Sequence, residues 1–315
     1  MAKLYYPNLT FLAVAHGLGI VALVYAALGQ ARCQTWLLGF LWLCCCSVSI
    51  TAGYHRLFAH RAYRAVWTIR LFYLLFGAAS LQNSALRWCA DHRAHHADTD
   101  GIRDPYSISR GFFWAHIGWV IFRSDGTQEL GRVRDLVTDG LLRFQHRHYP
   151  ALALIMGAVA PAALGWLWGD ALGAILLAGF LRLILQWHAT FAVNSLAHMI
   201  GRQPYTTAVS ARDSGLAALL TLGEGYHNYH HRFPSDYRNG VRWYQFDPTK
   251  WLIWTLGKLR LASGLRRVPS DVIESARLSV LRARPQGRLA VGCRAHMQPT
   301  ASAPPPAIVR GAHPS

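Results

Sequence analysis

The chain has 315 residues, of which 52% are apolar and only 15% are charged, and its mean hydropathy is positive at +0.16. This composition excludes a soluble two-domain protein and a largely disordered chain, and six unevenly spaced cysteines exclude a disulfide-stapled secreted domain. With 32 Lys and Arg against 15 Asp and Glu, the chain is also basic, which is compatible with nucleic acid, anionic lipid, an anionic substrate or a cytosolic membrane face.

Four apolar runs predict transmembrane helices. Residues 10–29 and 34–54 carry no charge, and each is long enough to cross a hydrocarbon core of about 30 Å at about 1.5 Å per residue. Residues 151–169 form a third uncharged run, and residues 171–193 form a fourth that only Arg182 interrupts. The sequence therefore predicts two helical hairpins.

Residues 71–86, between the two hairpins, are uncharged but contain Gln82, Asn83 and Ser84. This stretch is shorter and more polar than a transmembrane helix. We expect it to form an apolar helix that lies on or beneath one face of the membrane.

The charged residues are confined to two long segments. Residues 56–149 carry 13 Arg and 8 acidic residues, residues 199–315 carry 16 Lys and Arg and 6 acidic residues, and the hairpin loops hold only Arg32 and Asp170. The positive-inside rule therefore places both long segments and both termini in the cytosol. No nucleic-acid-binding motif accompanies the basic charge, so nucleic acid is not expected as a partner.

These observations predict an all-α integral membrane protein with four transmembrane helices in two hairpins and two long cytosolic segments. Its segments are a first hairpin (1–55), a cytosolic segment (56–149), a second hairpin (150–197), another cytosolic segment (198–281) and a tail (282–315). The tail is rich in Pro, Ala, Arg and Gly and is expected to be disordered.

Nine of the 16 histidines cluster in the membrane-flanking segments. They are His55 and His60 in HRLFAH, His92, His95 and His96 in HRAHH, His198 in NSLAH, and His227, His230 and His231 in HNYHH. Spacings of i, i+3 and i+4 lie on one face of a helix, so HRAHH and HNYHH can each present three imidazoles to a common centre. His55 and His60 are about 140° apart on an ideal helix, so the helix is expected to end or unwind between them.

The clustered histidines predict two metal ions. Imidazole is a ligand for iron, zinc, copper and nickel, and nine nitrogen ligands exceed one coordination sphere. If the clusters form one site, an even number of membrane crossings must separate them, and the second hairpin satisfies this condition. The isolated His16, His116 and His188 are expected to be hydrogen-bonded within the fold or exposed.

The segments around these histidines resemble the membrane fatty acid desaturases, most closely the acyl-CoA desaturases of the stearoyl-CoA type. The resemblance runs from about residue 51 to residue 269, through TAGYHRLFAHRAYRA, DHRAHHADTD, RGFFWAHIGW, NSLAH and GEGYHNYHHRFPSDYRNG. It implies four transmembrane helices, a cytosolic cap and a non-haem di-iron centre. It also implies that all nine clustered histidines bind two irons, and that Asn194 reaches one iron through water.

The resemblance further implies a reaction and its partners. Such enzymes use O2 to introduce a cis double bond at the delta-9 position of a saturated C16–C18 acyl-CoA. No haem-binding domain is recognisable at either end of the sequence, so electrons are expected from a separate cytochrome b5-like protein, ferredoxin or oxidoreductase. The brief N-terminus and the Ala- and Arg-rich composition favour a bacterial inner membrane over the endoplasmic reticulum.

Several positions match residues that contact the substrate in the resembling family. Gln82, Trp88 and Thr190 correspond to the bend of the acyl tunnel, Asn83 lies beside them, and Asp91 corresponds to a CoA contact. The chain departs from the family pattern at Ala90, where an Arg contacts CoA, and at Phe191, where a Trp is usual. Basic residues near the clusters are expected to hold the CoA phosphates, namely Arg56, Arg87, Arg93 and Arg123.

Carboxylates near the clusters are candidates to orient the histidine rings, because a neutral ligand ring donates its second N–H to an acceptor. These candidates are Asp91, Asp98, Asp104, Glu224 and Asp236.

Three alternatives to an acyl-CoA desaturase remain open from the sequence. The acyl group can be carried on a phospholipid, or the product can be a hydroxylated chain. A non-enzymatic metal transporter or sensor is the third, but its ligands would lie inside the transmembrane helices, whereas here they flank them.

Overall fold

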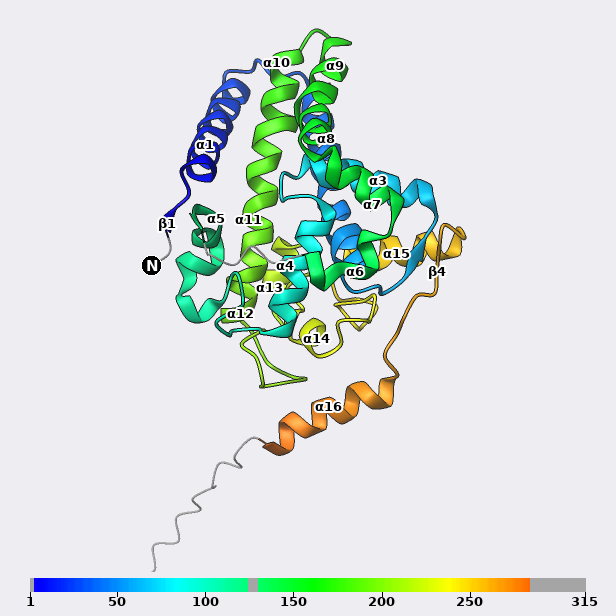
Figure 1. The fold of residues 1–315 in the computed structure, drawn as a ribbon. Helices are drawn as coiled ribbons and strands as arrows, with labels where there is room; N and C mark the ends of the chain where they lie inside the picture. The colour runs from blue at the N-terminus through cyan, green and yellow to red at the C-terminus, as the bar shows by residue number, and fades with distance from the viewer. Residues whose placement is uncertain (1–2, 124–129, 284–315) are drawn as a thin grey trace, which may run out of the picture. The chain divides into compact units, whose positions relative to one another are not determined.

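The computed structural model describes residues 3–123 and 130–283, and most of them are helical (Figure 1). Among these residues, four continuous helical segments are long and apolar enough to span a membrane, which confirms the predicted number of spans and the all-α class of integral membrane protein. Their bounds are Tyr6–Ala27, Cys33–Ala59, Tyr149–Trp166 and Ala171–Met199.

Three of these spans are composite. The second joins α2 (Cys33–Val48) to the π-helix η1 (Ser49–Ala59), and the third consists of α8 (Tyr149–Leu154), η5 (Ile155–Val159) and α9 (Ala160–Trp166). The fourth consists of α10 (Ala171–Ala174), η6 (Ile175–Leu181), α11 (Arg182–Asn194) and α12 (Leu196–Met199). The first span is a single helix, α1 (Tyr6–Ala27), which packs mainly against η6.

The loops of the two hairpins are joined by a buried polar cluster around Asp170. Its carboxylate caps α10 by accepting from the backbone of Gly173 at 3.0 Å, and it also accepts hydrogen bonds from Tyr25 at 2.8 Å and from Thr35. Asp170 is 5% exposed, so these bonds replace the water that its charge would otherwise require.

The remaining elements form the cap below the spans in Figure 1. In chain order the helices are α3 (Trp67–Ala79), α4 (Ala85–Ala97), η2 (Ile108–Arg110), η3 (Trp114–Gly118), α5 (Trp119–Ile121), η4 (Leu130–Val133), α6 (Arg134–Val137), α7 (Gly140–Arg147), α13 (Gly215–Leu220), α14 (His227–Arg232), α15 (Pro248–Lys258) and α16 (Ser270–Ala283). Two antiparallel strand pairs complete it, β1 (Lys3–Leu4) with β3 (Phe122–Arg123) and β2 (Arg64–Ala65) with β4 (Ala262–Ser263).

Residues 71–86 do not form a single helix. Helix α3 ends at Ala79, a turn follows, and α4 begins at Ala85. Helix α3 has 13 residues and is shorter than the four helices that are long enough to span a membrane, as expected for this stretch. The turn breaks the helix because Leu81 and Asn83 adopt positive φ angles of 52° and 74°, which a helix does not allow.

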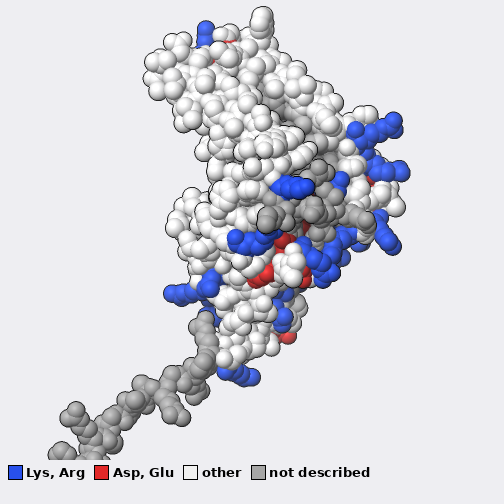
Figure 2. Space-filling view, turned by 60° about the vertical axis from the view of Figure 1, so that its left-hand side comes forward, with Lys and Arg blue, Asp and Glu red and all other residues white. Residues whose placement is uncertain are grey.

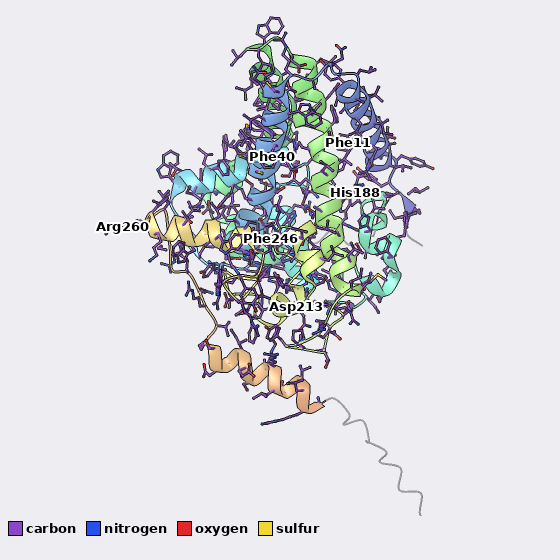
Figure 3. All side chains as sticks on the ribbon, turned by 180° about the vertical axis from the view of Figure 1, so that it is seen from behind. Phe11, Phe40, His188, Asp213, Phe246 and Arg260 are labelled. Carbon is purple, nitrogen blue, oxygen red and sulfur yellow. The ribbon has the colours of Figure 1, made fainter. Side chains whose placement is uncertain are left out.

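The largest hydrophobic core lies where η1, α3, α4 and α15 pack together. A Cβ at Gly53 or Gly77 would overlap Tyr73 or Tyr54, so these two glycines allow α3 to approach η1 closely. Figure 2 shows that Lys and Arg gather along the right-hand side and in the lower part of the face drawn, whereas a broad upper region carries almost no charge. Large apolar side chains such as Phe40 point outward from the upper region (Figure 3), as lipid contact requires.

The predicted tail begins inside α16, which continues to Ala283. The rest of it, residues 284–315, lies outside the described residues.

Candidate metal centre

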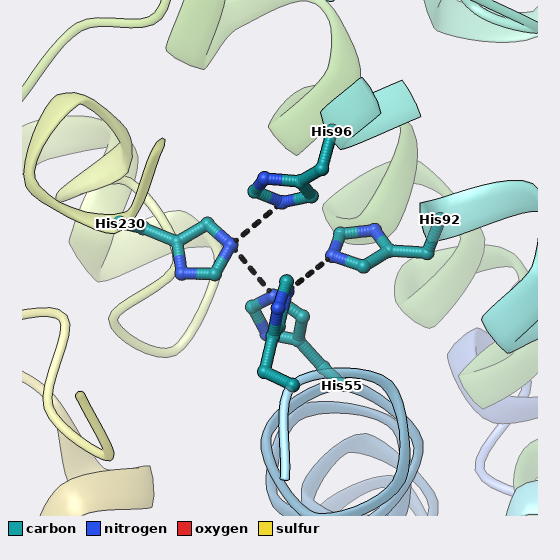
Figure 4. Close-up of side chains that lie close together, drawn as sticks. His55, His92, His96 and His230 are labelled. Atoms are coloured by element: carbon teal, nitrogen blue, oxygen red, sulfur yellow. Dashed lines mark hydrogen bonds between the residues drawn. The ribbon is translucent and has the colours of Figure 1, made fainter. Parts of the chain in front are cut away.

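The nine clustered histidines come together in two groups, and within each group the ligand atoms lie within 4.8 Å of one another. The first group is His55, His60, His92, His96 and His230, and the second is His95, His198, His227 and His231. Figure 4 shows four rings of the first group pointing toward one another from three different parts of the chain. Two groups of this size fit the prediction of two metal ions.

Each three-histidine motif is divided between the two groups. In α4, His92 and His96 belong to the first group and His95 to the second, whereas in α14 only His230 belongs to the first. The expectation that each motif serves one common centre is therefore wrong. Adjacent helical residues point about 100° apart, so His95 and His96 enter different groups, which lie side by side: the rings of His96 and His231 stack with their centroids 4.3 Å apart.

The first motif reaches its group through a widened helix. The backbone N–H of His60 donates to the carbonyl of His55 at 3.1 Å, which is the i→i+5 bond of a π-helix. This wider turn brings residues five apart to the same side. The helix also ends at Ala59, between His55 and His60, which confirms the expectation that it would end or unwind there.

The spacing of the ring nitrogens suits metal ions. In the first group, the Nε2 atoms of His60 and His92 are 2.7 Å apart, and the Nε2 of His230 lies 3.0 Å from that of His55 and 3.0 Å from that of His96. Two nitrogens bound at about 2.1 Å and at right angles to one metal would be about 3 Å apart. In the second group, the buried Nε2 of His198 has no hydrogen-bond partner among the described residues, as expected of a ligand atom.

The protonation state of the rings also suits metal binding. Burial lowers the pKa of six of these histidines in the cap well below the usual value, and their neighbouring rings lower it further. They are His60, His92, His96, His227, His230 and His231. Neutral imidazole is the form that binds a metal, so the site does not have to displace protons at neutral pH.

Two of the five candidate carboxylates contact a histidine ring. Glu224 lies 3.0 Å from the Nδ1 of His55, and Asp104 lies 2.9 Å from the Nδ1 of His95, although off the direction of a hydrogen bond. Burial alone would raise the pKa of Glu224, but His55 and Arg56 lower it to about 2.

The other three candidates have different surroundings. Asp98 pairs with Arg103, Asp236 accepts from Tyr229 and Arg238, and Asp91 lines the cavity described below, where burial raises its pKa to about 7.

The sequence did not reveal Asp100 as a partner of the site. The Nδ1 of His198 lies 2.7 Å from the hydroxyl of Ser210, which donates to Asp100 at 2.6 Å. Ser210 belongs to none of the histidine motifs, so its position in the sequence did not indicate that it links His198 to Asp100.

Two of the arginines expected to hold CoA phosphates are unavailable. Arg56 is 1% exposed and pairs with Glu224 and Asp247, and Arg93 pairs with Asp135 and donates to three backbone carbonyls. For these two residues the prediction is wrong, because each already neutralises carboxylates inside the cap. Arg87 is half-buried, and the side chain of Arg123, in β3, lies outside the described part of the chain.

A cavity of about 300 Å³ lies between the spans and the cap, next to both histidine groups. His55 and His92 of the first group and His95 and His227 of the second line it. Six predicted residues also line it, namely Gln82, Asn83, Trp88, Asp91, Thr190 and Asn194. The rest of the wall is mostly apolar, so the cavity suits a hydrocarbon chain held beside two metals.

Three of the residues matched to the tunnel bend are joined by hydrogen bonds. The side-chain amide of Gln82 donates to the hydroxyl of Thr190 at 3.0 Å, and the indole N–H of Trp88 donates to the carbonyl oxygen of Gln82 at 3.3 Å. These bonds fix three polar groups at one point of an otherwise apolar wall.

The isolated histidines form a separate chain of contacts. The Nε2 atoms of His16 and His188 are 3.1 Å apart, and His188 contacts His116 at 3.0 Å, which in turn contacts Ser195 at 2.9 Å. Figure 3 marks His188 on α11. The expectation that these rings are satisfied within the fold is confirmed, and none of them belongs to the two metal groups.

The chain is similar to known desaturases over most of its length. The model of the fatty acid desaturase family matches residues 34–262. Acyl-CoA desaturase 1 of Saccharomyces cerevisiae is 46% identical over 231 residues, 73% of this chain and 45% of the yeast protein. A probable acyl-CoA desaturase of Schizosaccharomyces pombe is 43% identical over 261 residues, 82% of this chain and 54% of that protein.

A human relative matches more completely. Stearoyl-CoA desaturase 5 of Homo sapiens is 36% identical over 274 residues, which are 85% of this chain and 82% of the human protein. This chain therefore spans about half the length of the two yeast proteins and about four fifths of the human one.

Proposed function

The chain belongs to the fatty acid desaturase family, and on that premise we propose that it is an acyl-CoA desaturase that forms a cis double bond at the delta-9 position of a saturated C16–C18 chain. The observation that carries the proposal is the cavity, because one apolar space touches both histidine groups and the hydrogen-bonded Gln82, Trp88 and Thr190.

The nine histidines would hold two irons, with Asn194 reaching one of them through water. Bound there, two irons would supply the oxidising power to remove two hydrogens from unactivated methylenes, with O2, two protons and two electrons from a cytochrome b5-like protein, ferredoxin or oxidoreductase consumed and two waters released. The residues of this chain orient the ligand rings through Glu224 and Asp104, and the buried walls exclude water.

The position of the double bond would be chosen by geometry. A saturated chain offers many methylenes of similar reactivity, so the cavity must hold one pair of carbons beside the metals. Gln82 and Thr190, which join the α3–α4 turn to α11, are suited to shape the chain at this point.

We propose that the acyl group is carried on CoA. The relatives are named for acyl-CoA substrates, which favours CoA. Ala90 lacks the guanidinium that the family uses, and Arg56 and Arg93 are occupied, so phospholipid-linked chains are the second candidate.

The test is the conversion of labelled substrates by purified, iron-loaded protein with a reducing donor system. We expect labelled stearoyl-CoA to yield a cis delta-9 product, identified by mass spectrometry after derivatisation. Conversion of phospholipid acyl chains but not of acyl-CoA would refute the CoA carrier, and a hydroxylated product would refute desaturation.

The bend residues give a second prediction. Gln82→Ala removes the donor to Thr190, and Thr190→Leu fills the space beside it, so both variants are expected to lower turnover or scatter the bond position while two irons remain bound. Product analysis and iron content measured on the same samples check this. Wild-type turnover and bond position in both variants would contradict a role for the bend.

We propose that the cap and both termini of this membrane protein lie in the cytosol. The basic residues cluster on the side of the cap, which supports a cytosolic cap and cytosolic termini. Of the membranes that fit this orientation, we favour a bacterial inner membrane over the endoplasmic reticulum.

A further inference from the structure

The turn between α3 and α4 forms part of the cavity wall in an unusual backbone conformation. Leu81, Gln82 and Asn83 all line the cavity, and two of them have positive φ angles, 52° at Leu81 and 74° at Asn83. Residues with side chains rarely keep such angles unless their surroundings hold them in place. The contacts of residues 79–85, called the cavity turn below, show what holds it.

One face of α11 holds the first half of the cavity turn. Arg182 donates to the carbonyl of Ala79 at 2.9 Å, and Gln186 donates to the hydroxyl of Ser80 at 2.9 Å. Thr190 receives the hydrogen bond from Gln82. Residues 182, 186 and 190 are spaced four apart, so they form one row along the helix.

Helices α7 and α8 hold the second half. The hydroxyl of Tyr149 accepts from the backbone N–H of Asn83 at 3.1 Å, and the side chain of Gln145 accepts from the backbone N–H of Ala85 at 3.0 Å. The cavity turn is therefore held between α11 of the fourth span on one side and α7 and the start of the third span on the other.

Among the residues that hold the cavity turn, Arg182 is the one whose burial is unfavourable, because it carries a charge. It lies within the fourth span, is only 2% exposed, and forms no ion pair with a carboxylate in the described part of the chain. A cation at this depth is unfavourable unless it has a specific partner. Arg182 donates to the carbonyl of Ala79, the last residue of α3, at the helix end that carries partial negative charge. It also donates to the carbonyl of Ala178 at 2.6 Å and to the side-chain oxygen of Gln186 at 3.4 Å.

We propose that Arg182 and Ser80 are positioning residues that set the location of the double bond, because together they hold Gln82 against the acyl chain. Neither lines the cavity. They act through the cavity turn, whose Gln82 meets Thr190 at the cavity wall. This inference rests on the proposed desaturase function.

The experiment compares the positional isomers formed by the full-length wild type, Arg182→Met and Ser80→Ala. Arg182→Met keeps an unbranched apolar stem but removes the guanidinium that donates to Ala79, and Ser80→Ala is a small change that removes the acceptor of Gln186. We expect the ratio of minor to major isomers to rise about five-fold for each hydrogen bond lost, which corresponds to about 1 kcal/mol per bond. Iron content is expected to stay at the wild-type level.

The matched control is Thr35→Val. It breaks a buried hydrogen bond to Asp170 in the other polar cluster between the spans, at the hairpin loops far from the cavity turn in sequence. It is expected to lower stability without changing the isomer ratio.

The outcomes separate the two proposals. Lower yield with an unchanged isomer ratio in both variants would show a purely structural role and overturn the inference, and Ser80→Ala alone decides this if Arg182→Met fails to fold. A wild type that forms no double bond would overturn the desaturase function and this inference with it.

Discussion

Replacement of His230 by Ala is expected to abolish desaturation and to lower the iron content from two per chain to about one. His230 is 1% exposed, and its Nε2 lies 3.0 Å from those of both His55 and His96, so its loss opens the centre of the first group. His95→Ala is expected to have the same effect through the second group. Metal analysis together with product analysis measures both results.

The control for this prediction is His16→Ala, because His16 is also a partly buried histidine in contact with another ring. It lies outside both groups, so its variant is expected to keep two irons and its activity. Full activity of His230→Ala or His95→Ala would remove that residue from the metal centre.

Glu224→Ala is expected to destabilise the protein by about 3 kcal/mol, the lower end of the range for breaking a buried ion pair. The substitution leaves the buried Arg56 with Asp247 as its remaining carboxylate partner and leaves the Nδ1 of His55 without its acceptor. Thermal unfolding in detergent measures the loss. The matched control is Glu274→Ala, because Glu274 is exposed and lies 3.9 Å from Arg277, a pair whose loss costs less than about 0.5 kcal/mol.

The effect of Glu224→Ala is also expected to depend on pH. The pKa of Glu224 in the folded protein is about 2, below its ordinary value of 4.5, so the carboxylate stabilises the fold above pH 4.5. This contribution is lost as the pH falls from 4.5 toward 2. The difference in stability between wild type and Glu224→Ala is therefore expected to shrink over this window, and a constant difference would contradict the assigned ion pair.

The four spans could be predicted from the sequence because hydrocarbon demands a long run of apolar side chains, and such runs are visible without tertiary information. The end of the second helix could be predicted only to lie between His55 and His60, and it lies at Ala59. The uncharged run stops at Tyr54, yet the helix continues through the charged Arg56. Glu224 and Asp247, distant in sequence, neutralise Arg56 and allow it to be buried.

The carboxylates that contact the histidines could also be predicted only in part from the sequence. Asp104 and Glu224 were found by their closeness to the motifs, whereas Asp100 reaches His198 through Ser210, 110 residues away from it in the chain. A carboxylate next to a motif in sequence does not have to point toward it, as Asp98 and Asp236 show.

The sequence by itself determined that this protein spans a membrane with four helices and that nine histidines are available for metals, because span length and helical spacing are local properties. Only the tertiary structure decided how HRAHH and HNYHH divide between two groups, since that depends on which side of each helix meets its neighbours. It also decided the place of Arg182, which in the sequence only interrupts an apolar run. Its partner, the carbonyl of Ala79, is 103 residues away and belongs to a helix whose end the sequence did not reveal, and such long-range contacts depend on the path of the folded backbone.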